Sequence, residues 1–121
     1  MLTEKDYCDF DTCVALEELG FNNLVNWYFN EEKSIVSSLA RYRNTYIPRI
    51  SLYEAQKWLR EERRIEANAF YDNMDAAWRF YILEIDSPDL SGTYAYNYAY
   101  MSYEEALLEG IKKAIKILSI C

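Results

Sequence analysis

The chain has 121 residues, the size of one ordinary domain with one hydrophobic core. Its twelve tyrosines and three tryptophans argue against disorder, and its formal net charge of −7 argues against nonspecific binding to nucleic acid or to anionic membrane. No apolar run approaches the ~18 residues of a membrane-spanning helix, and the polar, acidic start does not resemble a signal peptide. Three cysteines, at 8, 13 and 121, lack the spacing of a disulfide framework and favour a cytoplasmic location.

The first fifty residues predict short elements. A helix is expected from Thr12 to Leu19, with Asp11 as its N-cap. Gly20 would then be the left-handed residue that ends this helix, and Phe21 would pack back on Leu16 in a Schellman motif.

Two apolar runs follow, at residues 24–29 and 34–39, on either side of a polar turn at 30–33. They predict a β-hairpin, although the same runs could be helical. Residues 41–50 show no clear period, and Pro48 disfavours a helix before it, so we expect an extended connector there.

The stretch from 51 to 118 predicts the core of the fold. Helices are expected at 52–63 and 103–118, because each range follows a serine that precedes a glutamate by three residues, the pattern of a capping box. A hydrophobic staple is possible at both starts, from Ile50 to Ala55 and from Met101 to Ala106. Between the helices, alternating apolar residues predict strands at 65–69, 77–85 and 94–100, of which the second should be central.

We therefore expect an α+β fold: an α-β-β-β-α core, with two helices and a three-stranded antiparallel sheet, preceded by a short helix and a hairpin. Residues 1–121 should form a single domain, because residues 1–50 are too few to hold a core alone and should pack on 51–118.

The order of elements in 51–118 resembles the double-stranded RNA-binding domain. Where that family carries a phosphate-binding Lys-Lys-x-Ala-Lys cluster, this chain has Ser102-Tyr103-Glu104-Glu105-Ala106, with Tyr103 and Glu104 in place of the lysines. The turn at 72–75 also lacks the Gly-Pro-x-His type of minor-groove contact. The resemblance therefore implies a shared topology without the residues on which duplex RNA binding depends.

A second resemblance lies in sequence. The pieces Glu-Leu-Gly-Phe at 18–21, Glu-Ala-Gln-Lys-Trp-Leu-Arg-Glu at 54–61 and Tyr-Glu-Glu-Ala-Leu-Leu-Glu-Gly-Ile at 103–111 look like small proteins of bacteriophages and prophages of gut bacteria. The similarity extends from residue 11 to 118 and rests on caps and packing residues. It implies a cytoplasmic, non-secreted accessory protein and supplies no catalytic residue.

The residues themselves do not indicate a reaction. The chain has no histidine, the commonest general base, and its adjacent acidic pairs at 17–18, 61–62 and 104–105 do not face each other on a helix. Cys8 and Cys13 alone make no tetrahedral zinc site, and Cys13 fits a small core residue. We expect no enzyme activity, no cofactor and no metal site.

Two features point to a partner. Tyr94, Tyr96, Tyr98 and Tyr100 should share one face of the third strand, which either lies under the helices or forms an exposed aromatic strip that binds protein. Residues 34–64 carry seven basic against three acidic residues, whereas 65–110 carry one basic against nine acidic. This asymmetry either reflects ion pairs within the chain or a docking face that includes Arg41, Arg43, Arg60 and Arg64.

The sequence thus favours a protein-interaction module that binds another protein or itself and contacts no membrane. The alternative is a nucleic-acid-related role: RNA binding through the basic residues at 41–64, or nucleic-acid mimicry by the acidic region.

Overall fold

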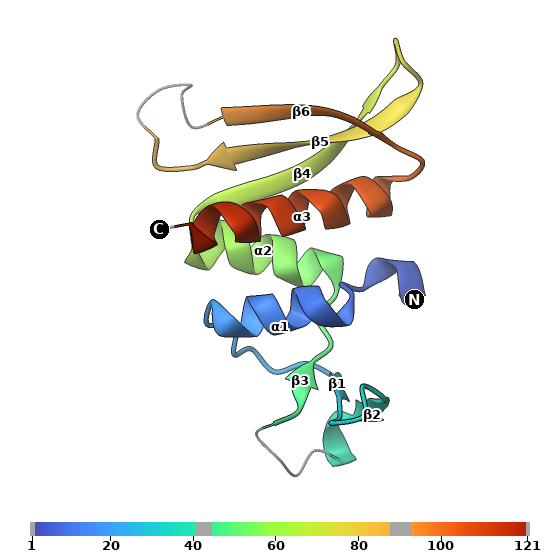
Figure 1. The fold of residues 1–121 in the computed structure, drawn as a ribbon, viewed down its shortest axis with the longest axis vertical. Helices are drawn as coiled ribbons and strands as arrows, with labels where there is room; N and C mark the ends of the chain where they lie inside the picture. Colours follow the sequence, from blue (N-terminus) through green and yellow to red (C-terminus); the bar gives the residue numbers. More distant parts are fainter. Residues whose placement is uncertain (1, 41–44, 88–92, 121) are drawn as a thin grey trace. The chain divides into compact units, whose positions relative to one another are not determined.

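In a computed structural model, residues 2–40, 45–87 and 93–120 are described, and the chain divides into two compact units, Met1–Ser51 and Leu52–Cys121 (Figure 1). The first unit contains η1 (Glu4–Asp6), α1 (Phe10–Glu18), β1 (Trp27–Phe29), β2 (Ile35–Ser37), η2 (Ser38–Ala40) and β3 (Ile47–Pro48). The second contains α2 (Leu52–Glu62), β4 (Ile65–Asp72), β5 (Ala77–Glu84), β6 (Thr93–Tyr100) and α3 (Tyr103–Ser119). The expected α+β class and its α-β-β-β-α core are confirmed. That the two units form a single domain stays a prediction.

Helix α1 begins earlier than the sequence predicts. Its N-cap is Asp9, which has an extended backbone and whose carboxylate accepts the Thr12 N–H at 2.8 Å. The expected cap Asp11 lies inside the first turn, so that expectation was wrong. Both aspartates can cap, and the earlier start places Phe10 within the helix, where its ring packs edge-on against Phe29 at a centroid distance of 5.2 Å.

The end of α1 has the predicted Schellman geometry. Gly20 has a φ of 113°, the Phe21 N–H donates to the Leu16 carbonyl at 3.0 Å, and the Gly20 N–H donates to the Glu17 carbonyl at 2.9 Å. Phe21 and Leu16 are both buried, so the expected contact between helix end and returning chain is supported by burial as well as by backbone bonds.

Strands β1 and β2 form the predicted antiparallel hairpin, and the helical alternative is wrong. The Asn30 side chain holds its turn by accepting the N–H groups of Glu32 and Ser34 at 3.0 and 2.9 Å. The expected connector also supplies β3, which pairs antiparallel with β1 and gives the order β2-β1-β3. Pro48 is tolerated in β3 because this strand lies at an edge of the sheet.

The second unit has a sheet of order β4-β5-β6, with β5 central as predicted. Helices α2 and α3 lie on the same side of this sheet (Figure 1). Ile82 of β5 and its neighbour Ala67 of β4 are fully buried. Helix α3 approaches β5 closely at Gly110, where an added Cβ would lie 3.2 Å from the Cβ of Phe80.

Polar side chains cap the start of α3 and cover an edge strand in this unit. Ser102 caps α3 as predicted, because its hydroxyl accepts the Glu105 N–H at 3.1 Å. The Gln56 amide donates to the Ala67 carbonyl at 2.8 Å, which covers part of the outer edge of β4. Met101 is 90% exposed, so the expected staple onto Ala106 is wrong.

Candidate interaction surfaces

Strand β6 holds the four tyrosines that the sequence singles out. The backbone register places Tyr94 opposite Ile82 and Tyr96 opposite Phe80, while the side chains of both tyrosines lie outside the described residues. The register then shifts, because Tyr100 pairs with Trp78. Strand β6 is therefore bulged between Tyr96 and Tyr100.

This bulge interrupts the predicted ladder. Tyr98 lies within it and is 63% exposed, whereas Tyr100 is half-buried, with its ring centroid 6.1 Å from that of Phe80. Burial, and next the nearby Glu109 carboxylate, raise the pKa of Tyr100. An uninterrupted ladder was thus a wrong expectation, since Tyr100 packs against the core and Tyr98 faces solvent.

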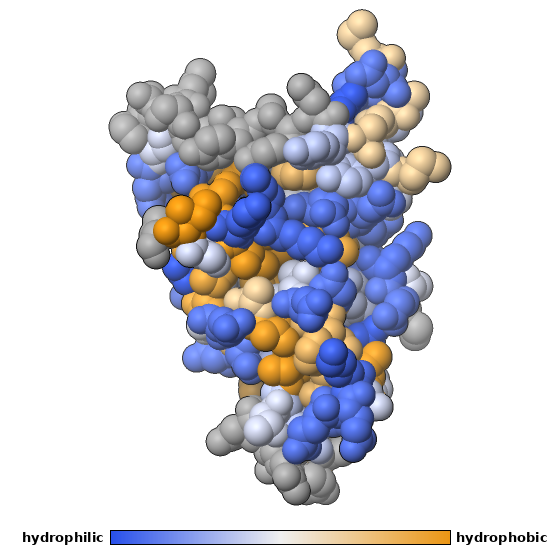
Figure 2. Space-filling model, in the orientation of Figure 1, coloured by the Kyte–Doolittle hydropathy of each residue, from blue (hydrophilic) through white to orange (hydrophobic). Residues whose placement is uncertain are grey.

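Exposed apolar side chains gather where β4 turns into β5 and where β6 ends. We define this hairpin-end surface by the following residues, which are between 38% and 94% exposed: Phe70, Tyr71, Met74, Tyr98 and Met101. In Figure 2 this end of the sheet carries pale orange, moderately hydrophobic atoms. Trp78 links its parts, because it pairs with Tyr100 across the sheet and its ring lies 5.2 Å from that of Tyr71. The sequence analysis did not identify Phe70, Tyr71 or Met74 as surface residues. Met74, an apolar residue within a polar turn, was the one signal that could have indicated this surface.

The hairpin that carries this surface is fastened by a buried cation. Arg79 is only 8% exposed, and its guanidinium donates to Asp72 at 2.9 Å and to Asp75 at 2.5 Å. Asp72 also accepts the Met74 N–H at 3.0 Å, which ties the turn to the same carboxylate. The hydrogen bond from Arg79 holds the pKa of Asp72 below its usual value near 3.8.

Of the basic residues predicted as a docking face, the structure describes Arg60 and Arg64. Arg41 and Arg43 lie outside the described residues. Arg60 pairs with Glu66 at 3.3 Å, and Arg64 pairs with Asp86 at 3.1 Å, which raises the pKa of the Arg64 guanidinium. These two pairs favour the reading in which the charge asymmetry is balanced within the chain.

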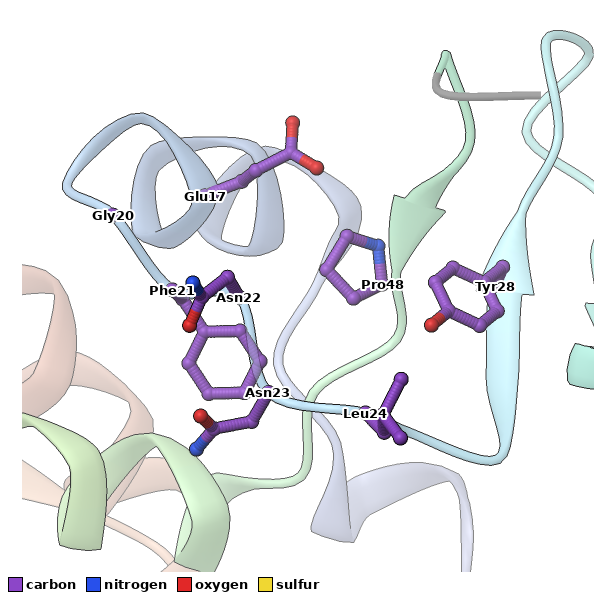
Figure 3. Close-up of a pocket in the computed structure, with 8 residues that line it drawn as sticks. All are labelled: Glu17, Gly20, Phe21, Asn22, Asn23, Leu24, Tyr28 and Pro48. Atoms are coloured by element: carbon purple, nitrogen blue, oxygen red, sulfur yellow. The ribbon is translucent and has the colours of Figure 1, made fainter.

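The first unit contains a hollow of about 300 Å³ between α1 and the sheet (Figure 3). It is lined by Glu17, Gly20, Phe21, Asn22, Asn23, Leu24, Tyr28 and Pro48. Figure 3 shows the rings of Tyr28 and Pro48 side by side on adjacent strands, with Glu17 and the loop at 20–24 around the rest of the opening. The lining offers one carboxylate and two amides without a nucleophile beside a base, so it suits hydrogen bonding better than catalysis.

A second hollow of about 530 Å³ lies in the same unit. It is lined by Leu2, Thr3, Glu4, Tyr7, Asn26, Trp27 and Arg49. The Arg49 guanidinium lies over the Tyr7 ring at 3.8 Å and donates to the Glu4 carboxylate at 2.6 Å. Sequence reasoning missed this group, because no short motif joins residues so far apart in the chain.

Cys13 is a buried core residue, as expected, and Cys8 is also buried and is not joined to it by a disulfide. The Cys13 sulfur accepts the Ile50 N–H at 3.4 Å. Its side-chain hydrogen bond with Cys8 lowers the pKa of the Cys13 thiol, against the opposing effect of burial.

Among residues 2–40, 45–87 and 93–120, no group of three or more cysteine, aspartate or glutamate side chains is arranged to hold a metal ion. Within the same ranges, every helix is too short or too polar to cross a bilayer. Comparisons of the chain with models of protein families, with curated proteins and with solved structures found no match.

Proposed function

We propose that this protein is a non-catalytic interaction module that binds a protein partner through the hairpin-end surface. The observation that carries the proposal is the concentration of large exposed apolar side chains around one end of the second unit's sheet, with Phe70 and Tyr71 on its opposite faces. Tyrosine, phenylalanine and methionine are enriched at protein interfaces, and single exposed apolar residues are common whereas clusters are not.

The same surface is held in place before any partner binds. Arg79, Asp72 and Asp75 fasten the turn, and the ring of Trp78 contacts both Tyr71 and Tyr103, at centroid distances of 5.2 and 5.6 Å. A preorganised surface loses less conformational entropy on binding, so its apolar contacts contribute more to affinity.

The other classes of function have less support. The linings of the two hollows and the lack of histidine favour binding over catalysis. The ion pairs of Arg60 with Glu66 and of Arg64 with Asp86 weaken the nucleic-acid alternative, because each arginine already has an acidic neighbour. The resemblance to phage and prophage proteins adds the proposal of an accessory protein in the bacterial cytoplasm, acting on a host protein, a phage protein or a second copy.

The test is an affinity pull-down from the producing cell at low and at moderately high salt, with sedimentation of the purified chain to detect self-association. The double variant Met74→Ser and Tyr98→Ser removes two exposed side chains of the surface, while Leu39→Ser, at a 91% exposed site of the first unit, is the matched control. We expect a discrete protein or a second copy to be held at high salt, lost in the double variant and kept in the control. Recovery of nucleic acid that salt or Arg60→Ala abolishes would instead establish the alternative.

A further inference from the structure

The hollow around Arg49 is built around a fixed and largely buried cation. The Arg49 side chain is 11% exposed, and its guanidinium stacks on the Tyr7 ring at 3.8 Å. Its backbone N–H donates to the Trp27 carbonyl at 2.9 Å, which fixes the base of the side chain beside strand β1. Both ends of the arginine are therefore held, and its charge lies at the wall of a space of about 530 Å³.

The Arg49 guanidinium has further N–H donors besides the one that binds Glu4. Its one hydrogen bond to a side chain in the described structure runs from Nη2 to the Glu4 carboxylate, at 2.6 Å. No buried side-chain nitrogen or oxygen in the described part of the chain lacks a partner, so the other N–H groups of Arg49 reach solvent. A guanidinium can bind a carboxylate through two parallel N–H donors, and Glu4 is held through one of them.

Glu4 is a weakly held occupant of this site. Its side chain is 87% exposed, and it belongs to η1, a single 3-10 turn near the start of the chain. An exposed carboxylate that pairs with a cation gains little free energy, because water and salt screen the pair. Another carboxylate with a better fit can therefore take its place.

We propose that this hollow binds a carboxylate-bearing ligand with a flat apolar body, and that Glu4 competes with the ligand for Arg49. The ligand's carboxylate would pair with Arg49, while its body would lie against the half-exposed Trp27 and Leu2, which line the same hollow. A monoanion fits better than a phosphate, because the lining offers one cation beside one acid. The same chemistry is presented by a free aromatic acid and by the C-terminal carboxylate of a peptide.

To separate the two sources, the full chain is titrated with 3-phenylpropanoate and with the peptide acetyl-Ala-Ala-Phe. Each acid is compared with its neutral isostere, in which a primary amide replaces the carboxylate. Binding is followed by NMR through the Trp27 indole N–H. We expect at least one acid to shift this signal and its amide to leave it unchanged. Arg49→Met should weaken binding roughly tenfold or more, because it removes a charge-assisted hydrogen-bond donor.

Glu4→Gln should change the affinity in the opposite direction. It removes the competing charge and should tighten binding by roughly two- to fivefold, the scale of an exposed ion pair. Glu32→Gln is the matched control, because it makes the same change at an exposed site in the hairpin turn and should leave the affinity unchanged. The Glu4→Gln arm remains decisive if Arg49→Met fails to fold. Equal binding of acid and amide, or no binding of either acid to wild type and Glu4→Gln alike, would overturn the proposal.

Discussion

Arg79 shows how one residue can fix a turn and make its stability depend on pH. Its hydrogen bond depresses the pKa of Asp72 below 3.8, so the unfolded chain binds more protons than the folded one in the window between the two pKa values. Stability conferred by this pair is therefore present above about pH 4 and lost as the pH falls through the folded pKa. We expect the melting temperature to fall steeply with acidification below pH 4.

Asp72→Asn tests this assignment. It should lower the melting temperature at pH 7, because Arg79 loses a charged partner at 2.9 Å, and it should make the acid-induced fall shallower. Asp11→Asn makes the same change at an exposed site of α1 and should leave the slope as in wild type. Thermal melts followed by circular dichroism between pH 7 and pH 2.5 measure both. An unchanged slope in Asp72→Asn would refute the role of this carboxylate.

Gly110 is required by the contact between α3 and β5. A Cβ at this position would lie 3.2 to 3.3 Å from three atoms of the Phe80 side chain. Alanine would gain about 1 kcal/mol of helix propensity and lose a similar amount to the tight contact, so Gly110→Ala should be close to neutral. Gly110→Val should destabilise the protein by roughly 2–4 kcal/mol, because two further methyl groups must enter the same space.

Chemical denaturation of these variants, beside Lys116→Val at an exposed site of the same helix, separates packing from propensity. The lysine control should cost less than about 1 kcal/mol. A valine at 110 that costs no more than a valine at 116 would show that the helix can move away from Phe80.

At the scale of the element, the sequence predicted those helices and strands whose patterns extend over several residues. Long alternating runs identified β4, β5 and β6, and serine–glutamate spacing identified the start of α3, because each pattern contains several agreeing residues. Some predictions that depended on one or two residues were wrong or were not made. Asp9 and Asp11 both suit an N-cap, and the structure shows that Asp9 is the one whose carboxylate accepts the Thr12 N–H. Strand β3 has two residues, too few to show a period.

Gly20, two residues after the end of α1, has a left-handed backbone conformation. Its φ of 113° is costly for any residue with a side chain, although nothing lies within 4 Å of an added Cβ. The cost of Gly20→Ala is therefore conformational, and we expect a loss of roughly 1–2 kcal/mol of unfolding free energy. Glu18→Ala, at an exposed position of the same helix, should be nearly neutral. Denaturant titration of both variants measures the difference, and equal stabilities would mean that the chain leaves α1 by another turn.

At the scale of the whole molecule, the candidate sites were harder to predict than the fold. The hollow around Arg49 joins residues from positions 2 to 49, and the hairpin-end surface joins positions 70 to 101. Such groupings depend on strand register and on turns, and a bulge moved Tyr98 out of a ladder that simple alternation had predicted. Sequence periodicity shows which face of an element is apolar, but it does not show which faces meet.

The two units differ in their capacity to fold alone. The first combines a nine-residue helix with strands of three, three and two residues. The second combines helices of eleven and seventeen residues with three eight-residue strands. Short chains bury too small a fraction of their surface to offset the loss of conformational entropy. We therefore expect residues 52–121 to fold without the rest, and residues 1–51 to remain unfolded in isolation.

Circular dichroism melts and amide hydrogen exchange on the two fragments test this expectation. The 52–121 fragment should melt cooperatively and protect the amides of β5, its central strand, while the 1–51 fragment should show neither a transition nor protection. Adding the 52–121 fragment to the 1–51 fragment then tests whether the first unit folds only when the second is present. A cooperative melt of 1–51 alone would show that its core, built on Leu16, Phe21 and Ile50, is sufficient, and the expectation of a single domain would fail with it.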